Sequence, residues 1–469
     1  MTGSERARRV RWWKVGLPVF LVAWTLTTHG KYSISGDEPH YLMITQSLVA
    51  DHDLDVANNY AQNDGRLFGH NNLEMGLHAV PARSGHIRPL HDIGLGVALI
   101  PVYVVAERLA MIPSDSLLTR ARMNRGLFAY SIVGLFLISM TTVGLTLLAD
   151  GLTSLLSPAA AALLVVAAGV SPPIVSHSFL VFPEVLALFV TCLVVWFSLS
   201  PLCSRDRTVL MWIACGLGML PWTHHKYLLY AFGLAFALVW MRWTMLRTLS
   251  WGDWALAVAL FGLPQLALHL WTWREWGTLS GALTASDVPL SLAVLKIGSI
   301  GLWMDRQSGL LSYAPLYWVV PACWLLTARR TWPLLVPATL LYLPAAAFTH
   351  GWWAGFSPAA RYIVPLMPVF LVVIADALRH PAIRISVVGL LIPQAVIDAV
   401  VWQHPRALWP AGTPVNAALE RVGWIGRAYE RLLPAVQAGE SIGTAFLIVT
   451  VVSAGLIALA AYGRSRAFR

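Results

Sequence analysis

The run GLFAYSIVGLFLISMTTVGLTLLA occupies residues 126–149 and carries no charged side chain. An α-helix rises about 1.5 Å per residue, so about 17–25 apolar residues cross the hydrocarbon core of a bilayer. Residues 126–149 therefore predict a membrane-spanning helix. The strands of a membrane β-barrel would instead read as short segments of alternating hydrophobicity, and the long unbroken runs exclude that class.

The composition of the whole chain leads to the same class. Of the 469 residues, 57% are hydrophobic and only 12% are charged, whereas a soluble domain carries about 25% charged residues. A soluble enzyme, a disordered chain and a disulfide-rich secreted protein are therefore excluded. We attribute the net charge of +10 to loops that face the cytoplasm and anionic lipid, and we expect no nucleic-acid partner.

Other apolar runs of spanning length lie on both sides of residues 126–149. The first, Val15–Thr28, follows a basic N-terminus and is not followed by a signal-peptide cleavage site, so we interpret it as a retained helix that starts in the cytoplasm. The remaining runs lie near residues 93–112, 158–176, 183–200, 208–223, 226–241, 253–273, 309–328, 332–349, 359–378, 383–402 and 441–462.

Basic residues in the short connections orient these runs. Clusters of arginine occur near residues 205–207, 242–247, 329–330, 379–384 and 464–469. The positive-inside rule puts them all in the cytoplasm, but parity would place them outside if every run crossed. We therefore expect residues 93–112, which contain Pro101, Glu107 and Arg108, to form a helix on the outer membrane surface. The alternative is that residues 158–200 cross only once.

This choice gives an all-α, polytopic bundle of about twelve spans, or thirteen if residues 93–112 also cross, with both termini in the cytoplasm. We divide the chain into a transmembrane domain, residues 1–402, a short outer segment, residues 403–440, and a last span with a basic tail, residues 441–469. The first outer loop, residues 30–125, is the largest and should contain juxtamembrane helices. Within the outer segment, ALERVGWIGRAYERLL predicts one amphipathic helix on the membrane surface.

The first outer loop contains the main candidates for catalysis. Asp37 and Glu38, in ISGDEPHYL, directly follow a helix end, where a partly desolvated carboxylate can act as a general base or a metal ligand. The alternative is that they cap the next helix, with Pro39 in its first turn. Farther along, Arg88 and His91 in RSGHIRPLHDIG could bind a phosphate or anchor the loop to lipid headgroups.

Later outer segments add further candidates at the ends of spans. They are His177 and Glu184 in SPPIVSHSFLVFPE, His225 and Lys226 in PWTHHKYLLY, Asp305 and Arg306 in GLWMDRQSG, and His350, Trp353 and Arg361 in HGWWAGFSPAARYIVPLMP. Lys226 and Arg361 have the chemistry of phosphate ligands, although snorkelling is an equal reading for the lysine. Carboxylates, cations and aromatic rings on one face suit a substrate that has a lipid tail, a phosphate and a sugar.

This arrangement resembles the GT-C superfamily of membrane glycosyltransferases, and within it the protein O-mannosyltransferases and the lipid A 4-amino-arabinose transferases. The resemblance covers roughly residues 15–380 and depends on the order of five motifs that are weak individually: GDEPHYL, RPLHDIG, FPE, HHKY and GFSPAARYIVPLMP. It implies a polyprenyl-phosphate sugar as donor, an unidentified glycan, lipid or protein as acceptor, and inversion at the anomeric carbon.

The resemblance also implies roles for individual residues. Asp37 would be the catalytic carboxylate, assisted by Glu38, while Arg88, Lys226 and Arg361 would bind the donor phosphate. Independently of the resemblance, we expect the remaining candidates to contact substrate: His91, His177, Glu184, His225, Asp305, Arg306, His350 and Trp353. Mg²⁺ or Mn²⁺ at Asp37 is left open, because no spacing is diagnostic of a metal site.

Two other functions remain in view. A secondary transporter or lipid flippase would carry ionisable residues near the middle of the bilayer and an inverted repeat, neither of which stands out here. A lipid-linked glycan polymerase or ligase would need a large late outer loop, whereas the largest loop of this chain is the first.

Overall fold

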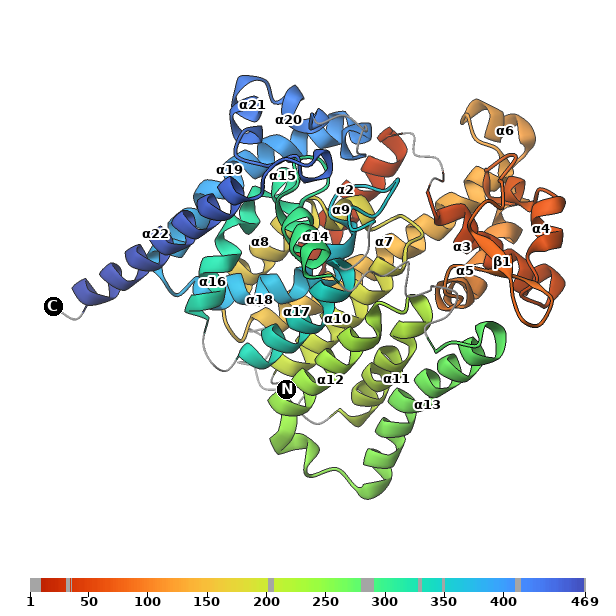
Figure 1. The fold of residues 1–469 in the computed structure, drawn as a ribbon, viewed down its shortest axis with the longest axis horizontal. Helices are drawn as coiled ribbons and strands as arrows, with labels where there is room; N and C mark the ends of the chain where they lie inside the picture. The colour runs from red at the N-terminus through yellow and green to blue at the C-terminus, as the bar shows by residue number, and fades with distance from the viewer. Residues whose placement is uncertain are drawn as a thin grey trace.

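The computed structural model describes residues 10–30, 34, 36–200, 206–279, 291–327, 331–347, 351–409 and 415–467. It is 74% helical, which confirms the predicted predominance of helix (Figure 1). Within the described residues, the strands are β1 (Ala79–Pro81) and β2 (Ile87–Pro89), which pair antiparallel with Val80 opposite Arg88.

Four described helices are long and apolar enough to cross a membrane. They are α7 (Arg125–Leu152), α12 (Tyr227–Leu246), α13 (Trp251–Trp276) and α19 (Pro381–Gln403). Shorter apolar segments lie in α8 (Pro158–Gly169), α10 (Pro183–Leu199), α14 (Leu292–Met304), α17 (Trp332–Ala347) and α22 (Gly443–Ala467). Two further predicted runs form α2 (Trp12–Gly30) and α11 (Arg207–Thr223). Apart from α14, these helices lie where the apolar runs predicted them.

Proline divides two of the predicted spans. Residues 309–328 form α15 (Leu310–Tyr313), the 3₁₀ turn η4 (Pro315–Val319) and α16 (Val320–Leu326). Residues 359–378 begin as the 3₁₀ segment η5 (Arg361–Leu366) and continue as α18 (Met367–Ala377). Proline lacks an amide proton and its ring disrupts the preceding turn, so Pro315 and Pro365 favour these breaks. Moreover, α14 falls between the predicted runs at residues 253–273 and 309–328, where no helix was predicted.

The first outer loop folds into a small helical unit beside the bundle, at the right of Figure 1. It contains α3 (Glu38–Gln46), the π-helical turn η1 (Ser47–Asp51), α4 (Ala57–Ala61), η2 (Asp64–Phe68), the β1–β2 hairpin, α5 (Gly94–Ala110) and α6 (Asp115–Arg120). Tyr41, Phe68 and Leu99 are buried in the core that this unit shares with α7. Helices are therefore present in this region as predicted, and α5 corresponds to residues 93–112.

The bundle is organised around α7 and α10. Helix α7 packs along α10, α2 and α8, while α12 packs against α17, and α10 also contacts η5 and α12. The N-terminal end of α10, the connection between α11 and α12, and the start of η5 consequently meet in space. These three places contain Glu184, Lys226 and Arg361 respectively.

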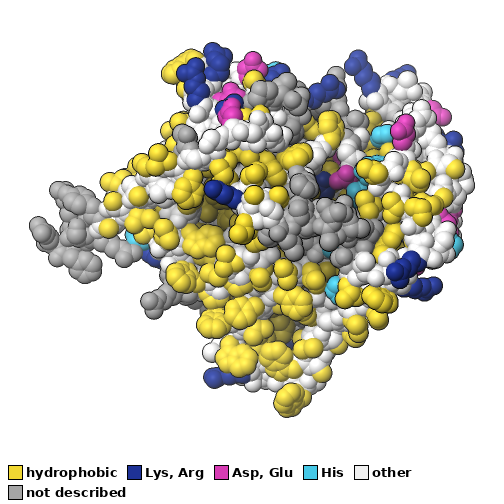
Figure 2. Space-filling model, in the orientation of Figure 1, with side chains coloured by type: hydrophobic (Ala, Val, Ile, Leu, Met, Phe, Trp, Pro, Cys, Tyr) yellow, Lys and Arg dark blue, Asp and Glu magenta, His cyan; other side chains and the backbone are white. Residues whose placement is uncertain are grey.

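Apolar side chains cover much of the lower part of the face drawn in Figure 2, over the region of α12 and α13, and charged side chains gather toward its upper and right-hand margins. Large exposed side chains on α12, α13 and α19 include Trp240, Leu263 and Ile392. Soluble monomers rarely expose continuous apolar surfaces of this extent. Helices α12, α13 and α19 are long and apolar enough to cross a membrane, where such side chains would contact lipid.

The prediction of one amphipathic helix over residues 418–433 is wrong. The structure has two short helices, α20 (Ala417–Arg421) and α21 (Trp424–Glu430), between the 3₁₀ turns η6 (Pro405–Leu408) and η7 (Val436–Ala438). The break falls at Gly423, whose φ of +86° lies in a region that side chains with a Cβ rarely adopt.

The orientation of α5 can be tested by cysteine labelling. In a cysteine-free background, we expect a cysteine at Ser116 to react with an impermeant reagent added outside, and one at Leu155 to react only from the cytoplasmic side. The reason is that we expect the loop between α7 and α8, which contains Leu155, to lie in the cytoplasm. Labelling of position 155 from outside would mean that residues 93–112 cross the membrane.

Candidate active site

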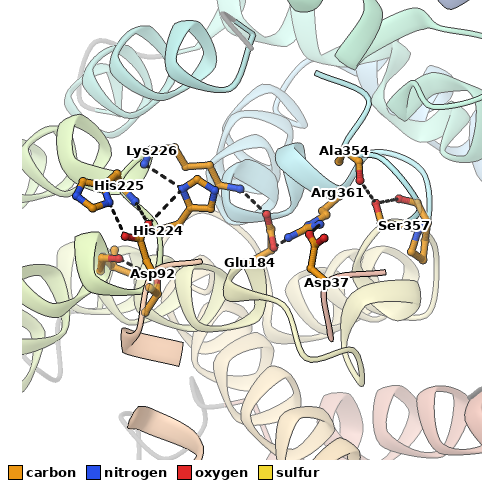
Figure 3. A network of polar contacts seen from close by, with 12 residues as sticks. Asp37, Asp92, Glu184, His224, His225, Lys226, Ala354, Ser357 and Arg361 are labelled. Atoms are coloured by element: carbon orange, nitrogen blue, oxygen red, sulfur yellow. Dashed lines mark hydrogen bonds and ion pairs between the residues drawn. The ribbon is translucent and has the colours of Figure 1, made fainter. Parts of the chain in front are cut away.

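The centre of the candidate site is one guanidinium between two carboxylates (Figure 3). Arg361 Nη1 donates to Asp37 Oδ2 over 2.8 Å, and Arg361 Nε lies 3.1 Å from Glu184 Oε2. The second contact is an ion pair but is not aligned as a hydrogen bond. The Arg361 side chain is 4% exposed and that of Glu184 is 0% exposed, whereas Asp37 remains 32% exposed. Asp37 is therefore the open side of the cluster.

Lys226 completes a row of alternating charges. Its Nζ donates to Glu184 Oε1 over 2.6 Å, so Glu184 contacts both cations. Aromatic faces cover the cations: Lys226 Nζ lies 3.9 Å from the ring centroid of Tyr362, and the Arg361 guanidinium lies 3.8 Å from that of Phe182. Cation–π contacts of this kind, together with the ion pairs to Asp37 and Glu184, offset the free-energy cost of removing the two positive charges from water.

Local backbone features place these side chains. Glu184 lies in the first turn of α10, after Pro183, where the helix dipole favours a negative charge. Gly36 has φ +58°, and a Cβ there would lie 2.5 Å from the carbonyl oxygen of Phe356, so glycine is required for Asp37 to approach the segment before Arg361. Asp37 occupies the N-cap position of α3 with Pro39 in the first turn, as the capping interpretation predicted, but its side chain makes no capping hydrogen bond.

Glu38 has a different position from its neighbour. It is fully buried, and its Oε2 accepts hydrogen bonds from the Tyr130 hydroxyl over 2.7 Å and from the Val181 amide over 2.8 Å. These bonds join α3 to α7 and to the turn before α10. Glu38 therefore attaches the outer unit to the bundle, and the catalytic assistance expected from the resemblance has no geometric support among these contacts.

Histidines of the first outer loop gather next to Asp37. His40 and His78 are stacked with ring centroids 3.5 Å apart, and His78 Nδ1 lies 2.9 Å from His91 Nε2. The ring nitrogen His40 Nδ1 is fixed by the Tyr60 hydroxyl at 2.7 Å. One ligand atom from each of Asp37, His78 and His91 lies within 4.8 Å of the others. The divalent cation that the sequence left open at Asp37 thus has a candidate ligand set.

Burial and charge together set the protonation of this region. Burial alone would raise the pKa of Asp37, but the positive charge of Arg361 outweighs it and holds that pKa well below its usual range. Burial lowers the pKa of His40 to about 3 and that of His91 to about 4. At neutral pH the carboxylate is therefore ionised and these two imidazoles are neutral.

A second polar contact extends the cluster toward α11. His225 Nδ1 lies 2.5 Å from Asp92 Oδ1, and the His225 amide donates to Asp92 Oδ2 over 2.8 Å. Gly94 permits this approach, because a Cβ there would lie 2.4 Å from the backbone of Trp222. His225, predicted as a substrate contact, is thus held against the outer unit beside Lys226 (Figure 3).

No protein-family model matches the chain, and no curated protein is significantly similar to it. The GT-C resemblance consequently depends on the sequence motifs alone.

The structure places the other predicted residues elsewhere. Arg88 donates to Glu275 on α13 over 3.1 Å, and Asp305 accepts from the amides of Ser308 and Gln437. Arg306 contacts Glu440 and therefore holds the outer segment. His177 is buried and Trp353 is partly exposed beside Trp352; His350 lies outside the described residues.

Sequence reasoning missed His78 and Asp92 as members of the site. His78 directly precedes β1, and its carbonyl accepts from the Leu90 amide over 2.8 Å, so the hairpin places it beside His91. The stretch HAVPARSGHIRPLH, with Ser84-Gly85 at its centre, contained the signal of two short strands around a turn. A hairpin assignment would have placed the two histidines close together at the open end of the hairpin, where His78 lies opposite Leu90.

Proposed function

We propose that the chain is an integral-membrane glycosyltransferase of the GT-C type. It moves a sugar from a polyprenyl-phosphate donor to an acceptor on the outer face of an inner or plasma membrane, with inversion. About twelve spans and two cytoplasmic termini belong to this proposal. The observation that carries it is the buried Arg361, which bonds the half-open Asp37 and contacts Glu184 next to Lys226. A guanidinium in such a place suits bidentate binding of a phosphate.

Arg361 and Lys226 form the donor-phosphate site in this proposal. In the structure they are balanced by the carboxylates of Asp37 and Glu184. An incoming phosphate competes with Asp37 for the guanidinium, because Asp37 is the exposed member of the cluster. Glu184 is fully buried and keeps both cations in position during this exchange.

The exchange also prepares Asp37 for proton transfer. A general base works best when its pKa lies near the operating pH, and beside Arg361 the pKa of Asp37 is too low. Loss of the ion pair to the donor phosphate raises the pKa of Asp37. The acceptor oxygen then attacks the anomeric carbon, the bond from that carbon to the phosphate oxygen breaks, the proton moves to Asp37 and polyprenyl phosphate leaves.

The test is transfer of label out of the donor lipid. Membrane vesicles that contain the protein would receive a panel of radiolabelled polyprenyl-phosphate sugars, with vesicles from the same cells lacking the protein as background. We expect one donor to lose its label above background and to leave polyprenyl phosphate. Retention of the label on every donor, with correctly folded protein present and cellular acceptors supplied, would contradict the proposed activity.

A further inference from the structure

We propose that Asp37, His78 and His91 bind one divalent transition-metal ion of the zinc class. The site lies in the outer unit, where α3 meets the end of the β1–β2 hairpin (Figure 1). Binding of the ion does not require the proposed glycosyl transfer, and it makes a prediction about the protein without donor or acceptor.

The two imidazoles already converge on one point. His78 Nδ1 and His91 Nε2 are 2.9 Å apart, a hydrogen-bond distance in which the donor depends on the tautomers of the two rings. Zinc bound to two histidines at about 2.0–2.1 Å holds their nitrogens about 3.3 Å apart in tetrahedral geometry. For a metal to take the place of this contact, each ring carries its proton on its other nitrogen and the two ring nitrogens separate by a few tenths of an ångström. The ligand atom of Asp37 lies within 4.8 Å of both, so it moves closer by up to about 1.5 Å.

The surroundings hold the ligands in place. The ring of His40 stacks on His78 at 3.5 Å, and His40 is itself fixed by the Tyr60 hydroxyl. Asp37 bonds Arg361 through Oδ2, and a carboxylate has a second oxygen to offer to a metal. Supporting contacts that fix ligand orientation are typical of metal sites.

The ligand types select the class of ion. Imidazole nitrogen suits Zn²⁺ and other transition ions, whereas Mg²⁺ and Ca²⁺ prefer oxygen ligands. Of the two ions considered from the sequence, the set of two histidines and one carboxylate therefore disfavours Mg²⁺. Three protein ligands leave at least one coordination position for water or substrate.

A metal here would change the charge balance of the neighbouring site. In that site the positive charges of Arg361 and Lys226 are balanced by the two carboxylates that they contact. Two added positive charges at Asp37 would attract an anionic substrate to the open side of the cluster. They would also keep Asp37 ionised, so the proposed proton transfer to Asp37 takes place in the metal-free site. This role depends on the proposed function, but the binding of the ion does not.

The experiment measures metal binding to purified full-length protein in nanodiscs, with the affinity tag removed and metal stripped by a chelator. ZnCl₂ alone is added, and bound zinc per protein is measured after desalting, together with the thermal unfolding temperature. We expect one zinc per protein and a raised unfolding temperature in the wild type. His78→Ala and His91→Ala should weaken zinc binding at least tenfold.

His86→Ala is the matched control, because His86 lies in the same hairpin connection but pairs with Asp55 and is half exposed. It should bind zinc like the wild type. If His91→Ala fails to fold, His78→Gln and the ligand-field absorption of bound Co²⁺ in the wild type provide the test. Wild-type protein that binds no zinc, or a His78→Gln protein with unchanged zinc affinity and an unchanged Co²⁺ spectrum, would overturn the proposal.

Discussion

Exchange of Asp37 for asparagine is expected to lower the rate of sugar transfer by about 10²–10⁴-fold, the range that loss of a general base typically produces. Asparagine keeps the shape of the side chain and can still accept a hydrogen bond from Arg361, but it cannot take a proton from the acceptor. Because Asp37 is 32% exposed, we expect the protein to fold and to reach the membrane normally. The measurement is initial transfer velocity in vesicles at equal protein level.

Glu74→Gln is the control for this comparison, because Glu74 is an exposed carboxylate of the same outer loop. It should transfer sugar at the wild-type rate. Transfer by Asp37→Asn within a factor of two of the wild type would remove Asp37 from the reaction.

Exchange of Glu184 for glutamine is expected to destabilise the protein by about 3–5 kcal/mol, as is typical when one partner of a buried ion pair is removed. Glu184 is fully buried and contacts both Lys226 and Arg361, whose side chains are only 7% and 4% exposed. The neutral amide leaves two buried positive charges with Asp37 as the remaining carboxylate of the cluster. Denaturant unfolding in nanodiscs, followed by tryptophan fluorescence, measures the loss.

The double variant Glu184→Gln/Lys226→Met separates charge from packing. Methionine removes the unpaired ammonium but keeps an apolar stem of similar length, so it should recover a large part of the lost stability. If the double variant were as unstable as the sum of the two single variants, the ion pair would not be the cause.

Much of the bundle could be predicted, because uncharged runs of spanning length leave the backbone little alternative to helix in lipid. Residues 126–149 indeed lie in α7. The predictions failed where local chemistry competes with hydrophobicity, as at Pro315 and at Gly423. Helix α14 was missed because its residues were assigned to a loop between spans.

Part of the candidate site could also be predicted from the hydrophobic pattern, because charged residues at the ends of apolar runs stand out. Asp37, Glu184, Lys226 and Arg361 were each singled out because a charge at the end of an apolar run is costly, and the fold brings these four together. Arg88 satisfied the same criterion, but its partner is Glu275, and a single sequence contains no information about which opposite charge it meets.

The roles of Glu38 and His78 could not be read from local sequence. Glu38 adjoins Asp37, yet its hydrogen bonds reach Tyr130 and Val181, which depends on how α7 and α10 pack. His78 became a neighbour of Asp37 through the hairpin and its stacking on His40. Both positions follow from tertiary contacts between segments distant in the chain.

The central claim is that Asp37 and the donor phosphate compete for Arg361, and the affinity for polyprenyl phosphate tests it most directly. This lipid is the product that the proposed reaction leaves behind. Its dissociation constant would be measured from the shift in thermal unfolding of wild type and Asp37→Asn in nanodiscs. Competition predicts tighter binding to Asp37→Asn, although that variant transfers sugar much more slowly than the wild type. Equal or weaker binding to Asp37→Asn would contradict the claim.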